Sequence, residues 1–260
     1  MSTEKQTLPE ALVASKNQLL ASEKACIALT LQESEQLNLW QSKVGGMPYL
    51  PLDIPYPQQQ NGEPLALLAQ INCAEMPRLA GFPEQGMLQF YIGQDDVWGL
   101  DFDNQQNQNG FRVLYFEDVI EDIEQLKQDF SDIEIGDELP FSGQYAIHFE
   151  QHSQLISVED INFNATLATV DVDDEALELY STLHSATGHR IGGYPYFTQS
   201  DPREYQPELK EYILLFQLDT DDSDGVDLMW GDCGVANFFI HPEDLKKRDF
   251  SKVLYNWDCC

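Results

Sequence analysis

The chain has 260 residues, of which 14 are Lys or Arg and 45 are Asp or Glu, so its formal net charge at pH 7 is −31. Its apolar fraction of 42% is typical of a globular protein rather than a disordered one. The charge argues against direct binding to nucleic acid or to an anionic membrane surface, because both kinds of contact need Lys and Arg side chains.

The first half of the chain reads as one helix followed by several strands. Apolar spacing from Pro9 to Lys24 predicts an amphipathic helix that begins at the proline. Short apolar runs bounded by turn formers predict strands at 26–31, 64–71, 87–92, 98–102 and 111–116, with a polar hairpin tip at 104–110. A short acidic helix is expected at 121–130.

The second half adds more strands than helices. Strands are expected at 144–150, 155–158, 212–218, 226–230, 237–240 and 250–257. A helix is expected from Asp173 to His184, with acids in its first turn, and a helical turn from Pro242 to Lys247. Strands and helices do not alternate regularly, so the predicted fold class is α+β with mainly antiparallel sheet.

Three blocks of sequence recur in the same order. Ser42–Tyr49 (SKVGGMPY) resembles His189–Tyr196 (HRIGGYPY) at an offset of 147 residues. The same offset aligns 67–72 with 214–219, and an offset of 148 aligns 86–92 with 234–240. We therefore predict an internal duplication with two pseudo-two-fold-related halves, whose core includes Leu68, Phe90, Leu215 and Phe238. The expected segments are 1–42 (an N-terminal helix and strand packed on the core), 43–140 (first repeat module), 141–188 (an acidic connection with a helix) and 189–260 (second repeat module).

These blocks resemble the YwqG-like family of bacterial proteins. The resemblance rests on Gly45–Pro51 (GGMPYLP), Leu68–Asn72 (LAQIN), Gly86–Phe90 (GMLQF), Gln217–Asp219 (QLD), Met229–Asp232 (MWGD) and Asn237–Ile240 (NFFI). It implies a duplicated α+β fold from about Lys43 to the C-terminus. It implies no established activity and therefore no catalytic residue, but it does imply an association with bacterial toxin and immunity systems.

Cysteine usage and the N-terminus bear on the compartment. The five cysteines are Cys26, Cys73, Cys233, Cys259 and Cys260, an odd number with no Cys-x-x-Cys spacing, which does not suit a disulfide framework or a zinc ribbon. The first ten residues show no signal-peptide pattern, and the longest apolar stretches fall far short of the roughly 20 residues of a spanning helix. We expect a reduced, cytoplasmic protein without a cofactor.

Three motifs invite a more specific chemistry. In the Gly-Gly-x-Pro-Tyr segments, Pro48 and Pro195 remove a backbone donor that a phosphate loop would need, so a structural turn is favoured. The acidic run Asp219–Gly225 lacks the EF-hand spacing and is interpreted as a solvated turn. His148 and His152 lie four residues apart in a predicted strand, which disfavours a zinc pair.

An enzyme is the alternative hypothesis. The segment Trp230–Gly234 places Cys233 in a glycine-flanked turn, and His184, His189 or His241 could supply a base. A site between the two repeats would then use Cys233, Asp232 and His189. No sequence spacing fixes such a pair, and a tight turn with an inert cysteine is favoured.

The acidic excess is the remaining feature. Between Asp95 and Glu178 there are 22 Asp and Glu residues and only two basic ones, Arg112 and Lys127. This stretch is either a solubilising face or a surface that steers a basic partner, because complementary charge raises association rates. The leading hypothesis is a binding protein without catalysis. An immunity protein that captures a basic toxin is one concrete form of it. Its candidate binding residues are Asp171, Asp173, Asp174, Glu175, Asp219, Asp221, Asp222 and Trp230.

Overall fold

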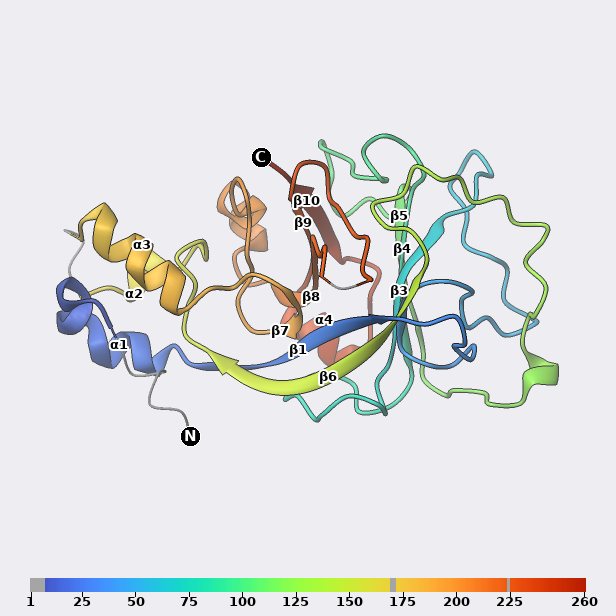
Figure 1. Cartoon of the computed structure of the whole chain (residues 1–260), viewed down its shortest axis with the longest axis horizontal. Helices are drawn as coiled ribbons and strands as arrows, with labels where there is room; N and C mark the ends of the chain where they lie inside the picture. The colour runs from blue at the N-terminus through green and yellow to red at the C-terminus, as the bar shows by residue number, and fades with distance from the viewer. Residues whose placement is uncertain (1–7, 169–171, 224) are drawn as a thin grey trace.

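The computed structural model describes residues 8–168, 172–223 and 225–260. Its described part is built on one ten-stranded sheet in which all paired strands are antiparallel (Figure 1). The strands are β1 (Lys24–Glu33), β2 (Lys43–Gly45), β3 (Ala66–Asn72), β4 (Met87–Ile92), β5 (Phe111–Phe116), β6 (Gln144–Gln154), β7 (His189–Gly192), β8 (Ile213–Asp219), β9 (Val235–Ile240) and β10 (Leu254–Asp258).

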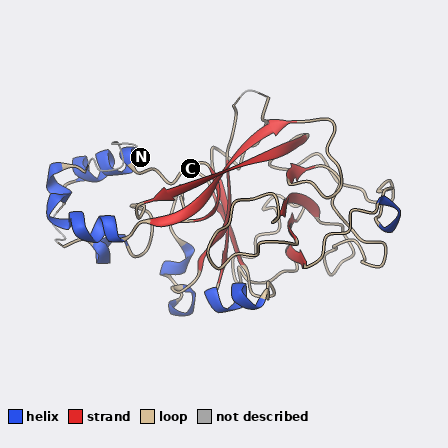
Figure 2. Ribbon diagram, turned by 90° about the horizontal axis from the view of Figure 1, so that it is seen from below, coloured by secondary structure: helices blue, strands red, loops and turns tan. Residues whose placement is uncertain are grey.

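Helices are few and short in the described residues. They are α1 (Lys16–Ala21), α2 (Phe163–Thr166), α3 (Asp174–Leu183) and α4 (Pro242–Lys247), with 3-10 turns η2 (Glu10–Ser15), η3 (Ile123–Gln125), η4 (Pro202–Glu204) and η5 (Pro207–Leu209). Helices α1, α2 and α3 gather at one end of the molecule, whereas η3 lies at the opposite end (Figures 1 and 2). The predicted fold class, α+β with mainly antiparallel sheet, is confirmed. No helix in the described ranges is long and apolar enough to cross a membrane.

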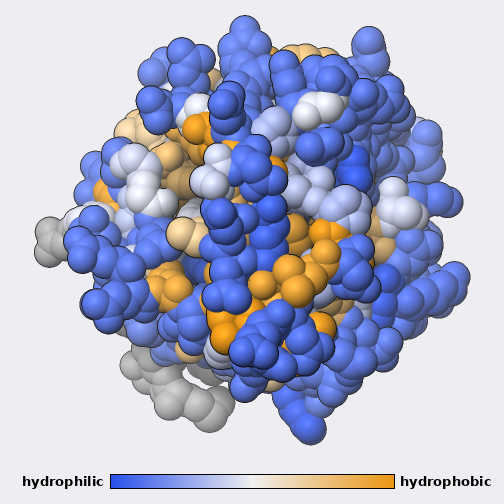
Figure 3. Space-filling model, turned by 90° about the vertical axis from the view of Figure 1, so that its right-hand side faces the viewer, coloured by the Kyte–Doolittle hydropathy of each residue, from blue (hydrophilic) through white to orange (hydrophobic). Residues whose placement is uncertain are grey.

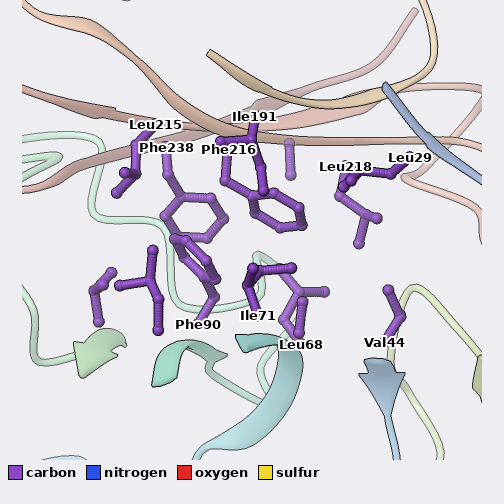
Figure 4. Packing of buried hydrophobic residues seen from close by; sticks show 14 of the residues in the cluster. Leu29, Val44, Leu68, Ile71, Phe90, Ile191, Leu215, Phe216, Leu218 and Phe238 are labelled. Carbon is purple, nitrogen blue, oxygen red and sulfur yellow. The ribbon is translucent and has the colours of Figure 1, made fainter. Parts of the chain in front are cut away.

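The core lies where the sheet folds back on itself. Phe90 of β4 stacks on Phe216 of β8 with ring centroids 4.6 Å apart, and it contacts Phe238 of β9 at 4.8 Å. Figure 4 shows Phe90, Ile71 and Leu68 reaching toward Phe216 and Phe238 from the other layer. Leu68, Phe90, Leu215 and Phe238 are all completely buried in this cluster, as predicted. Removing the apolar surface of each of these side chains from water contributes roughly 1.5–3 kcal/mol to the free energy of folding.

The strand order reads β10-β9-β8-β7-β1-β6-β2-β3-β4-β5. If each of β1 to β5 is matched with the strand five places later in the chain (β1 with β6, β2 with β7 and so on), the order is the same from either edge of the sheet to its centre, and in this sense it is palindromic. Matched strands also share register, because Lys43 pairs with Gln70 and Arg190 pairs with Gln217. The irregularity in β3 between Leu67 and Ala69 recurs in β8 between residues 214 and 216. The aligned sequence blocks therefore form matching strands.

Two fully buried glutamines make the same hydrogen bonds in the two halves. Gln70 Oε1 accepts from a backbone N–H, and its Nε2 donates to two carbonyl oxygens of the preceding loop; Gln217 does the same. The partners are Tyr49, Leu39 and Gln41 at 2.7–2.8 Å for Gln70, and Tyr196, Ala186 and Gly188 at 2.7–2.9 Å for Gln217. Each amide thus satisfies backbone groups that would otherwise be buried without partners.

Two of the predicted strands are replaced by turns or isolated bridges. Trp98 and Gly99 have φ angles of 48° and 78°, which a strand cannot accommodate, and Asp95 accepts hydrogen bonds from the N–H groups of Val97 and Gly99. Residues 226–230 contribute only bridges of Leu228. The strand predicted at 155–158 is also wrong, since β6 already ends at residue 154.

The predicted helices divide in a similar way. The N-terminal helix is split into η2 and α1, and the acidic helix predicted at 121–130 is reduced to η3. Beyond η3, Leu126 is extended and buried and bridges to Pro51, so the chain leaves the helical conformation to fill an apolar site. The start of β2 at Lys43 and of β7 at His189 falls at two of the predicted segment boundaries, although the division into four segments stays a prediction.

Candidate binding surface

The acidic residues that are contiguous in sequence lie at opposite ends of the molecule. Asp174 and Glu175 are exposed on α3 at one end, and Asp173 caps that helix by accepting from the N–H of Ala176 at 2.8 Å. Asp171 lies outside the described residues. The connection between β5 and β6 carries its acids to the other end, beside η3. The predicted acidic stretch is therefore not one surface.

We call residues 117–138 the acidic segment. It holds ten carboxylates, all of them exposed, and a single basic residue: Glu117, Asp118, Glu121, Asp122, Glu124, Asp129, Asp132, Glu134, Asp137 and Glu138 with Lys127. The Lys127 ammonium is 2.9 Å from a carboxylate oxygen of Asp132 and so does little to neutralise the rest. This end of the molecule carries a strong negative field, which falls off over a Debye length of roughly 8 Å at physiological salt.

Hydrogen bonds to two neighbouring loops hold the acidic segment in place, although it has almost no regular secondary structure. The N–H of Lys127 donates to the carbonyl of Leu50 at 2.8 Å, and the N–H of Leu52 donates to the carbonyl of Gln125 at 3.0 Å. Farther along, the Trp98 indole donates to the carbonyl of Glu138 at 2.9 Å. The carboxylates are thus presented from an anchored backbone.

Local hydrogen bonds keep two of these carboxylates ionised. The amide of Gln125 and the N–H of Glu124 lower the pKa of Asp122. In the same way, the N–H and hydroxyl of Ser131 lower the pKa of Asp129. A hydrogen bond to the charged form of a carboxylate favours that form. The field of the acidic segment therefore persists well below neutral pH.

Apolar side chains stand among these charges. Leu52, Ile123 and Ile135 are 65%, 41% and 38% exposed; Ile123 and Ile135 belong to the acidic segment, and Leu52 lies in the turn that is hydrogen-bonded to it. Figure 3, which looks onto this end of the molecule, shows apolar side chains enclosed by hydrophilic ones. An apolar centre with a charged rim is the usual composition of a protein–protein interface.

Two of the four predicted residues at the end of β8 and in the β8–β9 connection are buried. Trp230 is completely buried and packs against Trp98 and Trp257, with ring centroids 5.3 and 6.1 Å away. Asp219 is buried, and this burial raises the pKa of its carboxyl. Asp222 is exposed, and Asp221 is partly buried. Trp230 and Asp219 consequently offer almost no surface to a partner.

His189 has partners on both ring nitrogens. Its Nδ1 accepts from the N–H of Asp219 at 3.0 Å, so the ring proton resides on Nε2, which lies 3.0 Å from an oxygen of Asp221. This hydrogen bond from His189 holds the pKa of Asp221 well below its usual range. In the first half, the Ser42 hydroxyl accepts from the N–H of Asn72 at 2.9 Å in the matching position. The imidazole therefore replaces a hydroxyl as a structural acceptor.

Cys233 is exposed in the turn before β9 and has a φ of 66°. The neighbouring Asp232 is exposed as well. The turn is closed by a hydrogen bond of 2.6 Å from the N–H of Gly234 to the carbonyl of Trp230. Cys233 is accessible, as the sequence predicted, but His189 is already engaged by the strands and Asp221. A nucleophile–base pair would require one of these hydrogen bonds to break.

Sequence reasoning missed a buried ionic cluster. Arg203 donates to both carboxylate oxygens of Asp201 and, at 3.0 Å, to Asp160, and all three residues are buried. Its guanidinium also donates to the carbonyl of Tyr212 at 2.8 Å and lies 4.6 Å from the ring centre of Phe239. The spacing Asp201-Pro-Arg203 indicates a helical cap, but nothing local points to Asp160. The cluster ties the helical end of the molecule to the sheet.

Metal-ligand groupings are absent from the described part of the chain, in that no three His, Cys, Asp or Glu residues are placed to share an ion. His148 lies within β6 and contacts the Gln32 amide at 3.0 Å. His152, on the same strand, lies 3.3 Å from a carboxylate oxygen of Glu150. The two histidines face separate partners along an extended strand.

Comparison with known families gives one assignment. The model of the family described as Domain of unknown function (DUF1963) matches residues 42–259, and the chain belongs to this family. A comparison with curated proteins found no match. The assignment agrees with the expectation of a family without an established activity.

Proposed function

We propose that this protein is a binding protein without catalysis, and that the acidic segment captures a basic protein partner. The observation that carries the proposal is the composition of this end of the molecule. Ten exposed carboxylates of the acidic segment occur together with the exposed apolar side chains of Leu52, Ile123 and Ile135. A purely solubilising face has no need of exposed leucine and isoleucine, whereas a partner would bury them behind a charged rim.

Anchoring of the acidic segment supports the same function. Ordering a loop during binding costs free energy, and the contacts at Leu50, Gln125 and Glu138 have already met that cost in the free protein. The remaining candidates Asp173, Asp174, Glu175 and Asp222 lie away from this segment. They belong to the general negative field rather than to the contact surface.

Finer features of the proposal come from the sequence. The protein is a cytoplasmic YwqG-like member of its family, and one concrete form of the function is an immunity protein that neutralises a basic toxin. The palindromic strand order and the matched bonds of Gln70 and Gln217 support an origin by internal duplication. The enzyme alternative, with Cys233, Asp232 and His189, has weaker support because both His189 nitrogens have partners.

The test compares two variants of equal charge. The first neutralises four carboxylates of the acidic segment whose side chains make none of the hydrogen bonds described above: Glu117→Gln, Asp118→Asn, Glu121→Gln and Glu124→Gln. The matched control neutralises four exposed acids at the opposite end: Glu10→Gln, Asp174→Asn, Glu175→Gln and Glu178→Gln. Proteins captured from an extract of the source organism at low salt are identified, and the association rate of the captured basic protein is measured with each variant.

The segment variant should lower the association rate roughly tenfold at low salt, with a much smaller change in the dissociation rate. The control variant should change the rate by less than about twofold, because its charges lie beyond several Debye lengths. Equal effects of the two variants would show that only net charge matters. Turnover activity that is lost in Cys233→Ala would instead favour the enzyme.

A further inference from the structure

A hollow lies between the edge strand β5 and the link from α4 to β10. Its volume is about 390 Å³, and its lining includes Arg112, Arg248, Tyr115, Phe250, Gln108 and Ser251. Its lining residue Tyr115 lies two residues before the acidic segment, but the hollow shares no lining residue with that segment and the inference does not rest on the function proposed for it. It draws two of only 14 Lys and Arg residues of the chain into one small space.

Neither guanidinium in the hollow forms an ion pair with a carboxylate within the described part of the chain. This is notable in a chain with 45 acidic residues, in which Arg78, Lys127, Arg203 and Lys246 all pair with carboxylates. Both Arg112 and Arg248 are partly buried. A partly buried charge is stabilised by a counter-charge, so the hollow favours an anion from outside the chain.

Arg112 occupies a position that the fold does not require to be charged. It pairs with Tyr91 of β4, and the matching pair in the second half is Leu254 with Phe239. Leu254 is completely buried in an apolar cluster. Arg112 Nε donates to the carbonyl of Gln108 at 3.1 Å and Nη2 to the carbonyl of Gln58 at 3.4 Å, which orients the guanidinium and leaves the Nη1 donors of its planar fork for a ligand.

Arg248 is held in an unusual backbone conformation. It ends α4 with a φ of 60°, in the left-handed region where glycine is common and where other residues are strained. Its Nη1 donates to the carbonyls of Leu245 at 2.7 Å and Gly81 at 3.2 Å. Two carbonyl bonds therefore fix the guanidinium at the hollow without neutralising its charge.

The rest of the lining adds one backbone donor and an aromatic wall. The N–H of Val113 donates to the Gln108 side chain at 2.9 Å rather than to β4, so the N–H of Tyr115, two residues farther along this edge strand, also points away from β4. The rings of Tyr115 and Phe250 lie 5.4 Å apart and form an apolar surface. One oxygen of the nearby Asp249 carboxylate, Oδ1, accepts hydrogen bonds from the N–H and the hydroxyl of Ser251.

We infer that this hollow is a binding site for a small organic anion, in which the guanidinium groups of Arg112 and Arg248 hold a phosphate or carboxylate group and the Tyr115–Phe250 wall contacts an apolar or aromatic body. Arginine suits this chemistry because its planar fork can form two parallel hydrogen bonds with such an anion. The volume of about 390 Å³ is within the range of small-molecule sites.

The test is a titration of the full chain with three probes: inorganic phosphate, phenyl phosphate and benzoate. Binding is followed by calorimetry and by amide chemical shifts. Phenyl phosphate should bind at concentrations below about 10 mM and more tightly than inorganic phosphate, because it also covers the aromatic wall. The ratio between phenyl phosphate and benzoate identifies the preferred anionic group. Shifts should be centred on Val113–Tyr115 and on Ser251.

Charge variants then test the two arginines. Arg112→Gln and Arg248→Asn should each weaken phenyl phosphate binding about tenfold or more, and asparagine tolerates the backbone conformation at position 248. Arg78→Gln is the matched control, since it removes an equal charge from a side chain that is 84% exposed, pairs with Glu84 and lies outside the lining. Its affinity should change by less than about twofold.

Three results would overturn the inference, two of them measured on the wild-type chain. One is the absence of binding by any of the three probes to the wild-type chain. Another is a set of amide shifts that avoids residues 113–115 and 251, which is decisive even if an arginine variant fails to fold because it is measured on the wild type. Equal weakening in Arg78→Gln and Arg112→Gln would likewise show a general charge effect rather than a site.

Discussion

Lys43 makes the stability of this protein depend on pH in a calculable way. The residue is 1% exposed in β2, and its ammonium donates to the carbonyl of Asn38 at 3.0 Å. Burial lowers its pKa from the usual 10.5 to about 8, although the Glu75 carboxylate opposes part of this change. The matching residue of β7 is Arg190, another buried cation, whose pKa is also lowered by burial.

The sign follows from counting protons. Between pH 8 and roughly pH 10.4 the unfolded chain keeps the proton on Lys43, whereas the folded chain loses it. Because the unfolded state binds more protons, the free energy of unfolding contributed by this residue rises with pH across that window. The full change is about 3 kcal/mol, of which about 1.3 kcal/mol falls between pH 7 and pH 9.

The assay compares urea unfolding of the wild type and Lys43→Met at pH 7 and pH 9. Other titrating groups, including the buried Cys73 thiol, are common to both proteins and cancel in the difference. Relative to the variant, the wild type should gain about 1.3 kcal/mol on going to pH 9. Lys16→Met, at an exposed lysine, is the control and should show no such difference. A difference below about 0.3 kcal/mol, or one of opposite sign, would refute the assignment of a buried, easily deprotonated Lys43.

Three further predictions follow from the burial or exposure of single side chains. Phe238→Ala should destabilise the fold by about 3–5 kcal/mol in urea unfolding, while Phe102→Ala, at a side chain that is 75% exposed, should cost under about 0.5 kcal/mol; similar losses would place Phe238 outside the core. Arg203→Met should cost about 3–5 kcal/mol because two buried carboxylates lose their counter-charge, and an unchanged urea midpoint would contradict the ionic cluster. Cys233 should react with a thiol reagent in the native protein at the rate of an ordinary exposed cysteine, and a much faster rate would revive the enzyme hypothesis.

Much of the sheet could be predicted from the sequence. The bounds of β4, β5 and α4 coincide with those predicted, because each is a clear apolar or capped run with turn formers at its ends. The prediction of a strand at Trp98–Phe102 was wrong. Its apolar alternation is real, but the positive φ angles of Trp98 and Gly99 follow from the Asp95 turn and from packing in the tryptophan cluster, which local pattern does not reveal.

The location of the acidic charge could be predicted only along the chain. Acidic residues before and after β6 are close in sequence, yet this strand of 11 residues separates them. At about 3.3 Å per residue it spans roughly 35 Å, so the acidic segment and α3 are carried to opposite ends of the molecule. Composition cannot show this, because it depends on β6 being one continuous strand rather than two short ones.

The differences between matched strands separate the requirements of the fold from those of binding. At Gln70 and Gln217 both halves place the same amide in the same bonds, and substitution there should unfold either half. At Arg112 and Leu254 the matched positions differ in charge while the strands remain alike. The second half forms its sheet without a charge at this position, so the charge of Arg112 is not needed for folding. Its role must lie elsewhere. Substitution of Arg112 should therefore change binding at the hollow and leave the unfolding midpoint nearly unaltered.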